Sequence, residues 1–298
     1  MENGQELPAR KATGKAVLLL TLALILNGTE LFAMGLIESM SPPWLSVPIR
    51  MGFFGFYWGI SLAVLVGVWL WTRTYAPSLS VRGVQGALLS ALVALCSCGF
   101  LIFLANWNDK FAAMLTIILL GWFLYGLIGL ILSGLIRISK LRGFLHVPNS
   151  QTLTIRTIFF AIFFAAMATL MIKEIMTWGK ATDRLPWFQA SPITIQQWVF
   201  TMSMLTAVAV STACLTYLKI AGAVFKATRK YTIALVPLVL ILPSLIHILD
   251  QLVSAFLRMK QWQTMVESYL IYLPAELSLI LGLRLVIGLL PINRAALA

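Results

Sequence analysis

Hydrophobic residues fall into eight long runs, each bounded by charged residues, proline or glycine. A helix needs about 20 mostly apolar residues to cross a bilayer, and every run reaches that length. The pattern predicts an all-α integral membrane protein with eight transmembrane helices. The predicted spans are 15–38, 51–72, 83–105, 111–136, 153–178, 193–218, 231–257 and 268–290.

The composition agrees with this pattern and leaves little chain for a soluble domain. Of the 298 residues, 60% are hydrophobic and only 11% are charged, whereas soluble domains carry about 25% charged residues. We therefore expect residues 1–298 to form one integral membrane domain. The first run follows Arg10, Lys11 and Lys15 like a signal peptide, but no small-residue cleavage site follows it, so we interpret it as an uncleaved span.

The basic residues predict the orientation of the chain, because cytoplasmic loops of membrane proteins are enriched in Lys and Arg. With the N-terminus inside, fifteen of the 22 Lys and Arg fall on the cytoplasmic side and seven on the outer side. We therefore expect both termini in the cytoplasm of a cell (inner or plasma) membrane. The net charge of +12 is spread over these loops, which argues against nucleic acid as a partner. The inside set is Arg10, Lys11, Lys15, Arg73, Arg82, Arg137, Lys140, Arg142, Arg156, Lys219, Lys226, Arg229, Lys230, Arg284 and Arg294.

The two halves of the chain resemble one another, which suggests repeats at 13–142 and 153–290. Glu30 and Glu174 are each followed by a similar Pro-Trp segment, 43–49 in the first half and 186–193 in the second. The fourth and eighth spans each carry a Tyr and an Arg at equal spacing. These pairs are Tyr125 with Arg137 and Tyr272 with Arg284. Repeats of four spans share an orientation, so an axis along the membrane normal would relate them. The alternative is chance, since Pro and Trp recur at membrane interfaces.

Five ionisable residues inside the predicted spans are the candidates for binding a substrate or proton, because a charge within the bilayer is costly. They are Glu30, His247, Asp250, Glu276 and Arg284. From a helical rise of about 1.5 Å per residue, all except Arg284 are expected in the outer half of the membrane, where they could share one polar pocket.

Two pairs among these candidates leave alternatives open. His247 and Asp250 are three residues apart and share a helix face, so a proton-binding pair is one interpretation. The other places Asp250 at the headgroups and His247 in a bond to a neighbouring helix.

Glu276 and Arg284 lie about 12 Å apart along one face of the predicted helix, too far for a direct pair. Arg284 either contacts substrate or extends to the cytoplasmic interface.

Two further sequence features concern the packing of the helices. Pro237 and Pro243 lie in the seventh span, where proline tends to kink a helix, and broken helices often line transporter sites. Gly55 and Gly59 form a GxxxG spacing that favours close helix packing, and we expect this packing within the bundle rather than between copies.

No sequence motif indicates a cofactor, a metal site or catalytic chemistry. The chain lacks a phosphate-binding loop, a zinc-binding HExxH pair and a GxSxG elbow. Cys96, Cys98 and Cys214 all fall inside apolar runs. We interpret them as buried thiols, not as a disulfide or metal site.

Three functional hypotheses remain. The first is a transporter of a small solute or ion, with carboxylates that take up protons. The second is an accessory or assembly subunit whose helices pack on membrane-protein partners. The third is an enzyme that acts on a lipid-linked substrate. Apart from the bilayer itself, the sequence identifies no partner and no substrate.

Overall fold

The computed structural model describes residues 43–75, 79–104, 110–138, 195–224, 228–258 and 264–289, which form six helices and no strand. Each of these helices overlaps a predicted span. Helix α2 begins eight residues before its predicted span, so the segment 43–49 is helical. The predicted spans 15–38 and 153–178, with Glu30 on the first, lie outside the described residues. The helices are α2 (Pro43–Tyr75), α3 (Leu79–Leu104), α4 (Lys110–Ile138), α6 (Ile195–Val224), α7 (Thr228–Phe256) and α8 (Met265–Leu289).

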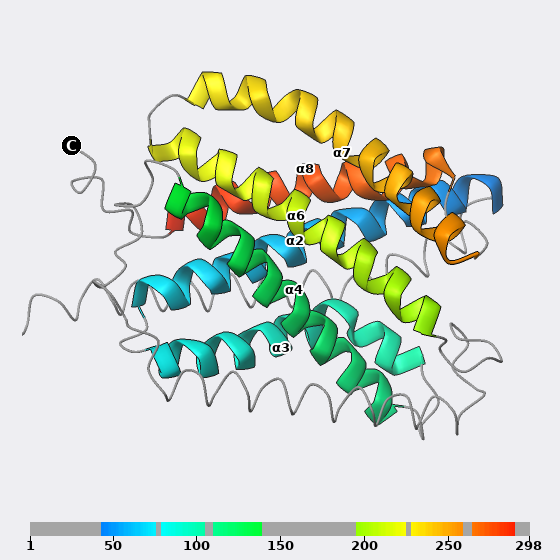
Figure 1. Ribbon diagram of the computed structural model, residues 1–298, viewed down its shortest axis with the longest axis horizontal. Helices are drawn as coiled ribbons and strands as arrows, with labels where there is room; N and C mark the ends of the chain where they lie inside the picture. The colour runs from blue at the N-terminus through cyan, green and yellow to red at the C-terminus, as the bar shows by residue number, and fades with distance from the viewer. Residues whose placement is uncertain are drawn as a thin grey trace, which may run out of the picture.

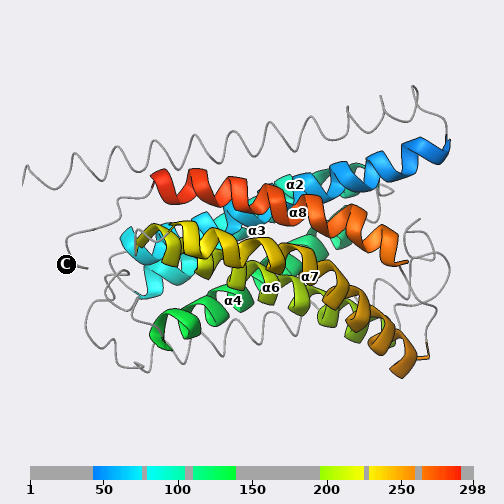
Figure 2. The ribbon, with the colours of Figure 1, turned by 90° about the horizontal axis from the view of Figure 1, so that it is seen from above.

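The six helices form a bundle in which α2, α4, α6 and α8 run in one direction and α3 and α7 in the other (Figures 1 and 2). Five of them are long and apolar enough to cross a membrane, and in α3 the apolar stretch is Gly83–Leu95. The five stretches are Val47–Arg73, Met114–Ile138, Val199–Ala223, Ile233–Phe256 and Met265–Ile287. These helices indicate a membrane protein, whereas the count of eight spans stays a prediction.

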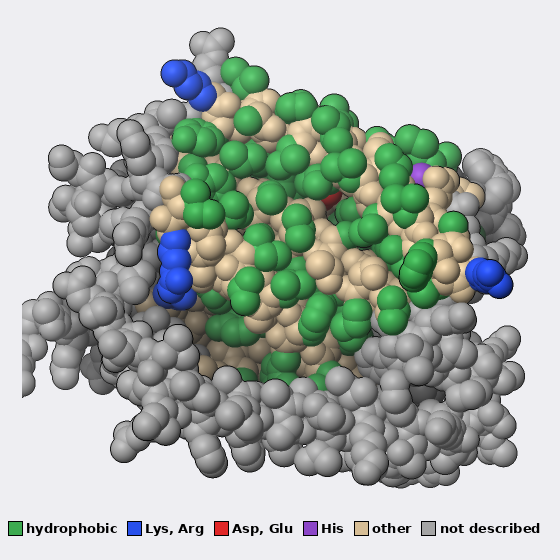
Figure 3. Space-filling view, in the orientation of Figure 1, with side chains coloured by type: hydrophobic (Ala, Val, Ile, Leu, Met, Phe, Trp, Pro, Cys, Tyr) green, Lys and Arg blue, Asp and Glu red, His purple; other side chains and the backbone are tan. Residues whose placement is uncertain are grey.

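The surface of the bundle also indicates a bilayer, because large apolar side chains face outward. Along α7 the exposed set recurs at intervals of three or four residues, with one adjacent pair: Ile233, Val236, Leu240, Ile241, Leu245, Ile248, Leu252 and Phe256. Figure 3 shows a face that is almost wholly hydrophobic, with Lys and Arg confined to its two ends. A soluble monomer rarely exposes so large an apolar patch, so this face suits contact with lipid chains.

The most extensive helix contact joins α2 to α8, and small residues make it possible. A Cβ atom added to Gly55 would overlap the carbonyl oxygen of Ile271, and one added to Gly59 would overlap that of Ala275. Gly67, two helical turns further along, packs against Val286 of α8. The expectation that the GxxxG pair packs within the bundle is therefore confirmed.

The contacts between helices occur in matching pairs. Each contact has a counterpart in which α2, α3 and α4 take the places of α6, α7 and α8, and the reverse. Helix α2 packs on α3 as α6 packs on α7, and α3 packs on α4 as α7 packs on α8. In the same way, α2 contacts α8 as α6 contacts α4, and α2 contacts α4 as α6 contacts α8. The paired contacts differ in extent, most of all because α2 and α8 approach so closely.

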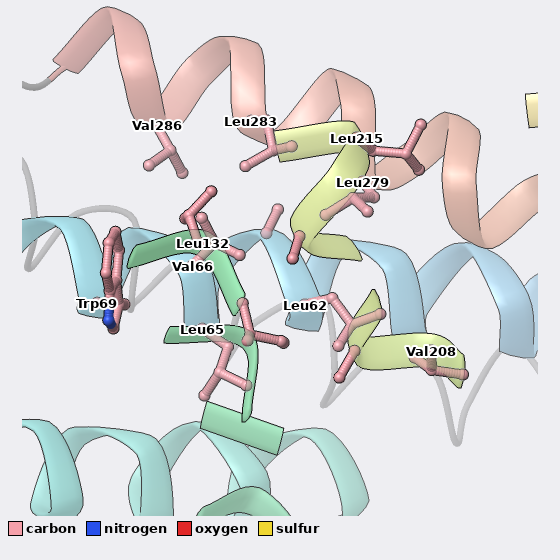
Figure 4. Close-up of a cluster of buried hydrophobic side chains, with 14 of the residues drawn as sticks. Leu62, Leu65, Val66, Trp69, Leu132, Val208, Leu215, Leu279, Leu283 and Val286 are labelled. Carbon is pink, nitrogen blue, oxygen red and sulfur yellow. The ribbon is translucent and has the colours of Figure 1, made fainter. Parts of the chain in front are cut away.

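An apolar core fills the space where α2, α4, α6 and α8 meet (Figure 4). Leu132 of α4, Leu215 of α6 and Leu283 of α8 are completely buried there, together with Val66 of α2. Such close-packed alkyl groups hold the helices in fixed positions. Because the core fixes α6 and α8, it also fixes the polar side chains that these two helices carry one to two turns away.

Local interactions define the ends of α7 and α8. Helix α7 runs through Pro237 and Pro243 without interruption, and it is followed by Arg258, whose φ of 54° lies in the left-handed region that commonly ends helices. Helix α8 begins with a capping box, in which Thr264 Oγ1 accepts from the Glu267 backbone N–H and Glu267 Oε2 accepts from that of Thr264. Helices α7 and α8 also contact one another.

Candidate functional site

Three of the five predicted site residues are buried in the bundle, two on α7 and one on α8. The exposed fractions of His247, Asp250 and Glu276 are 7%, 3% and 4%. Asp250 lies six residues before the end of α7, and Glu276 is close to the middle of the 25-residue helix α8. Of the other two candidates, Arg284 is exposed on α8, and Glu30 lies outside the described residues.

His247 is held by one hydrogen bond along α7 and one to α8. Its Nε2 atom lies 3.1 Å from Gln251 Nε2, and its Nδ1 atom lies 3.4 Å from Ser268 Oγ. Because an amide nitrogen donates and does not accept, Nε2 is the acceptor, and the ring proton is on Nδ1 and is donated to Ser268. Among the described residues no hydrogen bond joins His247 to Asp250. The arrangement matches the interpretation in which His247 bonds a neighbouring helix.

Asp250 is buried and only partly satisfied by hydrogen bonds. Its Oδ1 atom accepts from Ser254 Oγ at 3.3 Å, and its Oδ2 atom has no partner within the described part of the chain. The Asp250 carboxylate also interacts electrostatically with the Tyr272 hydroxyl of α8. Asp250 therefore lies in the interior of the bundle, within electrostatic range of α8.

Glu276 has no hydrogen-bond partner for either carboxyl oxygen among the described residues. It lies one helical turn from Tyr272, on the same face of α8. A buried carboxylate ion without a donor or a cation costs several kcal/mol. Within the described residues, no hydrogen-bond donor offsets this cost for Glu276.

Arg284 is not placed to neutralise Glu276. Its side chain is exposed two turns further along α8 and lies within electrostatic range of Lys219 of α6. Both basic residues occur towards the end of the bundle at which α6 and α8 end. This position agrees with the interpretation in which Arg284 extends to the membrane interface.

The structure adds polar residues that the sequence analysis did not select for the site. Thr212 and Thr216 of α6 are fully buried, and their hydroxyl oxygens have no partner in the described ranges. Ser268 and Tyr272 of α8 complete the surroundings of His247 and Asp250. The sequence analysis considered only ionisable groups inside the spans, so it did not select these hydroxyl groups.

A groove of about 720 Å³ lies on the bundle surface between α6 and α7. Its lining is nearly all apolar, and none of the five candidates belongs to it. The lining residues are Val199, Met202, Ser203, Thr206, Ala207, Val210, Ser211, Leu242, Leu245, Ile246 and Leu249. No group of three or more His, Cys, Asp or Glu within the described ranges could hold a metal ion.

Comparison of the chain with protein-family models, with curated proteins and with solved structures finds no match. The function therefore has to be inferred from the residues of this chain. In the part of the chain that the structure describes, they define an all-helical, apolar bundle typical of a membrane protein, with two acids buried in its interior.

Proposed function

We propose that this protein is a multi-pass transporter of a small solute or ion, in which buried carboxylates carry the coupled protons. Glu276 is the principal proton carrier, and Asp250 is the second. The observation that carries this proposal is Glu276 itself, which is 4% exposed and has no partner for either oxygen in the described region. An acid that served only to hold helices together would be expected to have a hydrogen-bond or charge partner.

The proposal includes eight spans with both termini in the cytoplasm of the cell membrane. Two observations support it. Helix α4 ends at the end of the bundle opposite to that where α6 begins (Figure 1), as one further span between them requires. The exposed basic residues are also unequally divided: Arg137, Lys230 and Arg284 lie towards the proposed inner end, and Arg258 lies at the outer end.

The proposed transporter is built from two repeats, 13–142 and 153–290, related by an axis along the membrane normal. The exchange symmetry of the helix contacts supports this arrangement, since each contact in one half has a counterpart in the other. An experimental structure tests it directly. The two repeats should superpose with spans 15–38 and 153–178 in equivalent places, and unrelated positions of these two spans would contradict the duplication.

Proton uptake by Glu276 is tested by infrared difference spectroscopy on the purified protein in lipid nanodiscs. A change from acidic to alkaline buffer should remove the C=O band of a protonated carboxyl group. This band should be missing from the Glu276→Gln spectrum but retained in that of Glu267→Gln. Glu267 is a matched control because it lies on the same helix, at its capped and accessible start.

Coupled transport is tested in proteoliposomes that contain a pH-sensitive dye. Addition of a transported solute should move protons through the wild-type protein, and Glu276→Gln and Asp250→Asn should abolish this movement. Both substitutions preserve side-chain shape, so the variants should be inserted at wild-type abundance. Loss of abundance with normal proton movement would instead favour a structural role for the acids.

The second candidate function is an accessory or assembly subunit, which the apolar groove between α6 and α7 favours. A groove of this kind on a bilayer-facing surface could receive a helix of a partner protein. Under this function, Glu276→Gln and Asp250→Asn would change the recovery of a co-purifying membrane protein, and proton movement would be absent from the wild-type protein as well.

A further inference from the structure

Two basic residues lie near one another at the end of the bundle where α6 and α8 end. Lys219 is partly buried on α6, Arg284 is exposed on α8, and the two charges are within electrostatic range of each other. Each lies five residues before the end of its helix, and the two helices run in the same direction and contact one another (Figures 1 and 2). Like charges in this range repel, and an anion that contacts both would offset the repulsion.

No acid in the described part of the chain neutralises this pair. Neither Lys219 nor Arg284 has a hydrogen bond or an ion pair within the described ranges. The acids in those ranges are Asp250, Glu267 and Glu276. Asp250 and Glu267 lie near the opposite end of the bundle, and Glu276 is about 12 Å from Arg284 along the axis of α8. The pair therefore forms a positively charged place on the bundle.

Arg73 of α2 provides a comparison at the same end of the bundle, because there the protein itself supplies the contacts. Its Nη1 atom donates to Ser133 Oγ of α4 at 3.3 Å, and its guanidinium carbon lies 5.3 Å from the centre of the Trp69 ring. Lys219 and Arg284 have no corresponding contact within the described ranges. Their charges are therefore available to a ligand.

The surface of α8 beside Arg284 is apolar and faces outward. A leucine row, Leu277, Leu281 and Leu285, recurs at intervals of four residues, with exposed fractions of 50%, 60% and 57%. Arg284 is three residues from Leu281 and next to Leu285, so its side chain starts beside this row. The row extends from Arg284 to the middle of the helix. A cationic pair beside exposed hydrocarbon matches the two parts of a phospholipid, a charged headgroup and its acyl chains.

We propose that Lys219, Arg284 and the leucine row bind an anionic phospholipid. The guanidinium group of Arg284 donates to two phosphate oxygens, and the ammonium group of Lys219 adds the second positive charge. One acyl chain lies along Leu281 and Leu277. The cytoplasmic leaflet carries the anionic lipids, and the proposed topology places this end of the bundle on that side. The site does not include Glu276, so this inference does not depend on proton transport.

Phosphatidylglycerol is the probe for this site, and phosphatidylcholine with the same acyl chains is the lipid without net charge. Native mass spectrometry of the purified protein in detergent gives the dissociation constant of the first bound lipid. Phosphatidylglycerol should bind at least about fivefold more tightly than phosphatidylcholine, since one basic residue near a membrane surface contributes about 1 kcal/mol. Arg284→Gln and Lys219→Gln should each weaken phosphatidylglycerol binding by about fivefold. Arg284→Lys keeps the charge and should retain most of the affinity.

Lys230→Gln is the matched control for these variants. Lys230 is exposed at the same end of the bundle, at the start of α7, but it is not among the charges that act on Lys219. This variant should bind phosphatidylglycerol like the wild-type protein. Equal losses in Lys230→Gln and Arg284→Gln would show a general attraction to a basic surface and would overturn the assignment of a site. Arg284 is exposed, so its replacement should leave the fold intact, which thermal unfolding checks.

Two soluble compounds distinguish a lipid headgroup from a free phosphate. Inorganic phosphate and glycerophosphoglycerol, which is the headgroup without acyl chains, are each added at the concentration of the lipid. Neither should displace phosphatidylglycerol, because neither contacts the leucine row. Displacement by either compound would show that the two cations hold a soluble phosphate, and the lipid assignment would be wrong. Binding that resists both compounds and is weakened in Arg284→Gln and Lys219→Gln supports the proposal.

Discussion

Gly59 of α2 packs against the backbone carbonyl of Ala275 in α8, the residue immediately before the buried Glu276. The position of this acid therefore depends on how closely the two helices approach. Four small residues at intervals of four, Gly55, Gly59, Ala63 and Gly67, follow the contact along α2. Side chains larger than these would push α8, together with Glu276, away from α2.

The first prediction concerns this contact. Gly59→Val should lower the free energy of unfolding by about 1–3 kcal/mol or more, because the new side chain overlaps backbone atoms that cannot rotate away. Thermal unfolding of the purified protein in detergent measures the effect. Gly126→Val is the control, since a Cβ at Gly126 meets no atom within 4 Å. Similar losses in the two variants would show that helix propensity, and not packing, decides the result.

The second prediction concerns the hydrogen bond between Thr72 of α2 and Tyr125 of α4, whose oxygens are 3.1 Å apart. Thr72 Oγ1 already donates to the Trp69 carbonyl, so the Tyr125 hydroxyl is the donor. A double-mutant cycle with Thr72→Val and Tyr125→Phe should give a coupling energy of about 0.5–1.5 kcal/mol. Thr72→Val combined with Tyr269→Phe should be additive, because Tyr269 bonds to α7 instead.

The third prediction concerns topology. Because the Lys and Arg residues alternate between sides, reporter fusions should be external after residues 45, 108, 185 and 262. Fusions after 78, 145, 226 and 298 should be internal. The reporter activity of each fusion is divided by its immunoblot signal, so that low expression is not mistaken for the opposite location. Consistent reversal at any one loop would remove one span from the proposed topology.

Much of the fold was predictable from the sequence because hydrophobic run length is a strong signal in membrane proteins. The runs at 51–72 and 268–290, for example, correspond to α2 and α8. The close contact between these two helices was only half predictable. Gly55 and Gly59 indicated a packing surface, but a GxxxG spacing does not name its partner, which is set by the arrangement of the whole bundle.

The site was less predictable, because hydrogen bonds depend on rotation angles that sequence spacing does not give. His247 and Asp250 share a face by spacing, yet His247 bonds to Gln251 and Ser268. The unpaired state of Glu276 and the inward direction of Thr212 depend on how α6 and α8 are rotated about their axes. Charge alone identified the three buried ionisable residues on α7 and α8.

The fourth prediction concerns the cost of keeping Glu276 in the interior. An unpaired buried acid destabilises the protein that contains it, and replacing buried charged groups by apolar ones often stabilises a protein by about 1–4 kcal/mol. Glu276→Leu should therefore raise the unfolding temperature while it abolishes proton movement. A gain in stability together with a loss of proton movement is the trade-off expected for a functional residue.

Glu267 on the same helix provides the matched comparison, because it is a glutamate that does have partners. Its carboxylate accepts from the backbone N–H and the hydroxyl group of Thr264 at 2.7 and 3.0 Å. Glu267→Leu breaks this cap and should lower stability by about 0.5–2 kcal/mol, with proton movement retained. The two substitutions remove the same group from one helix, and we expect opposite signs in thermal unfolding. If Glu276→Leu also lowers the unfolding temperature, Glu276 has a stabilising partner, and its role as an unpaired proton carrier is wrong.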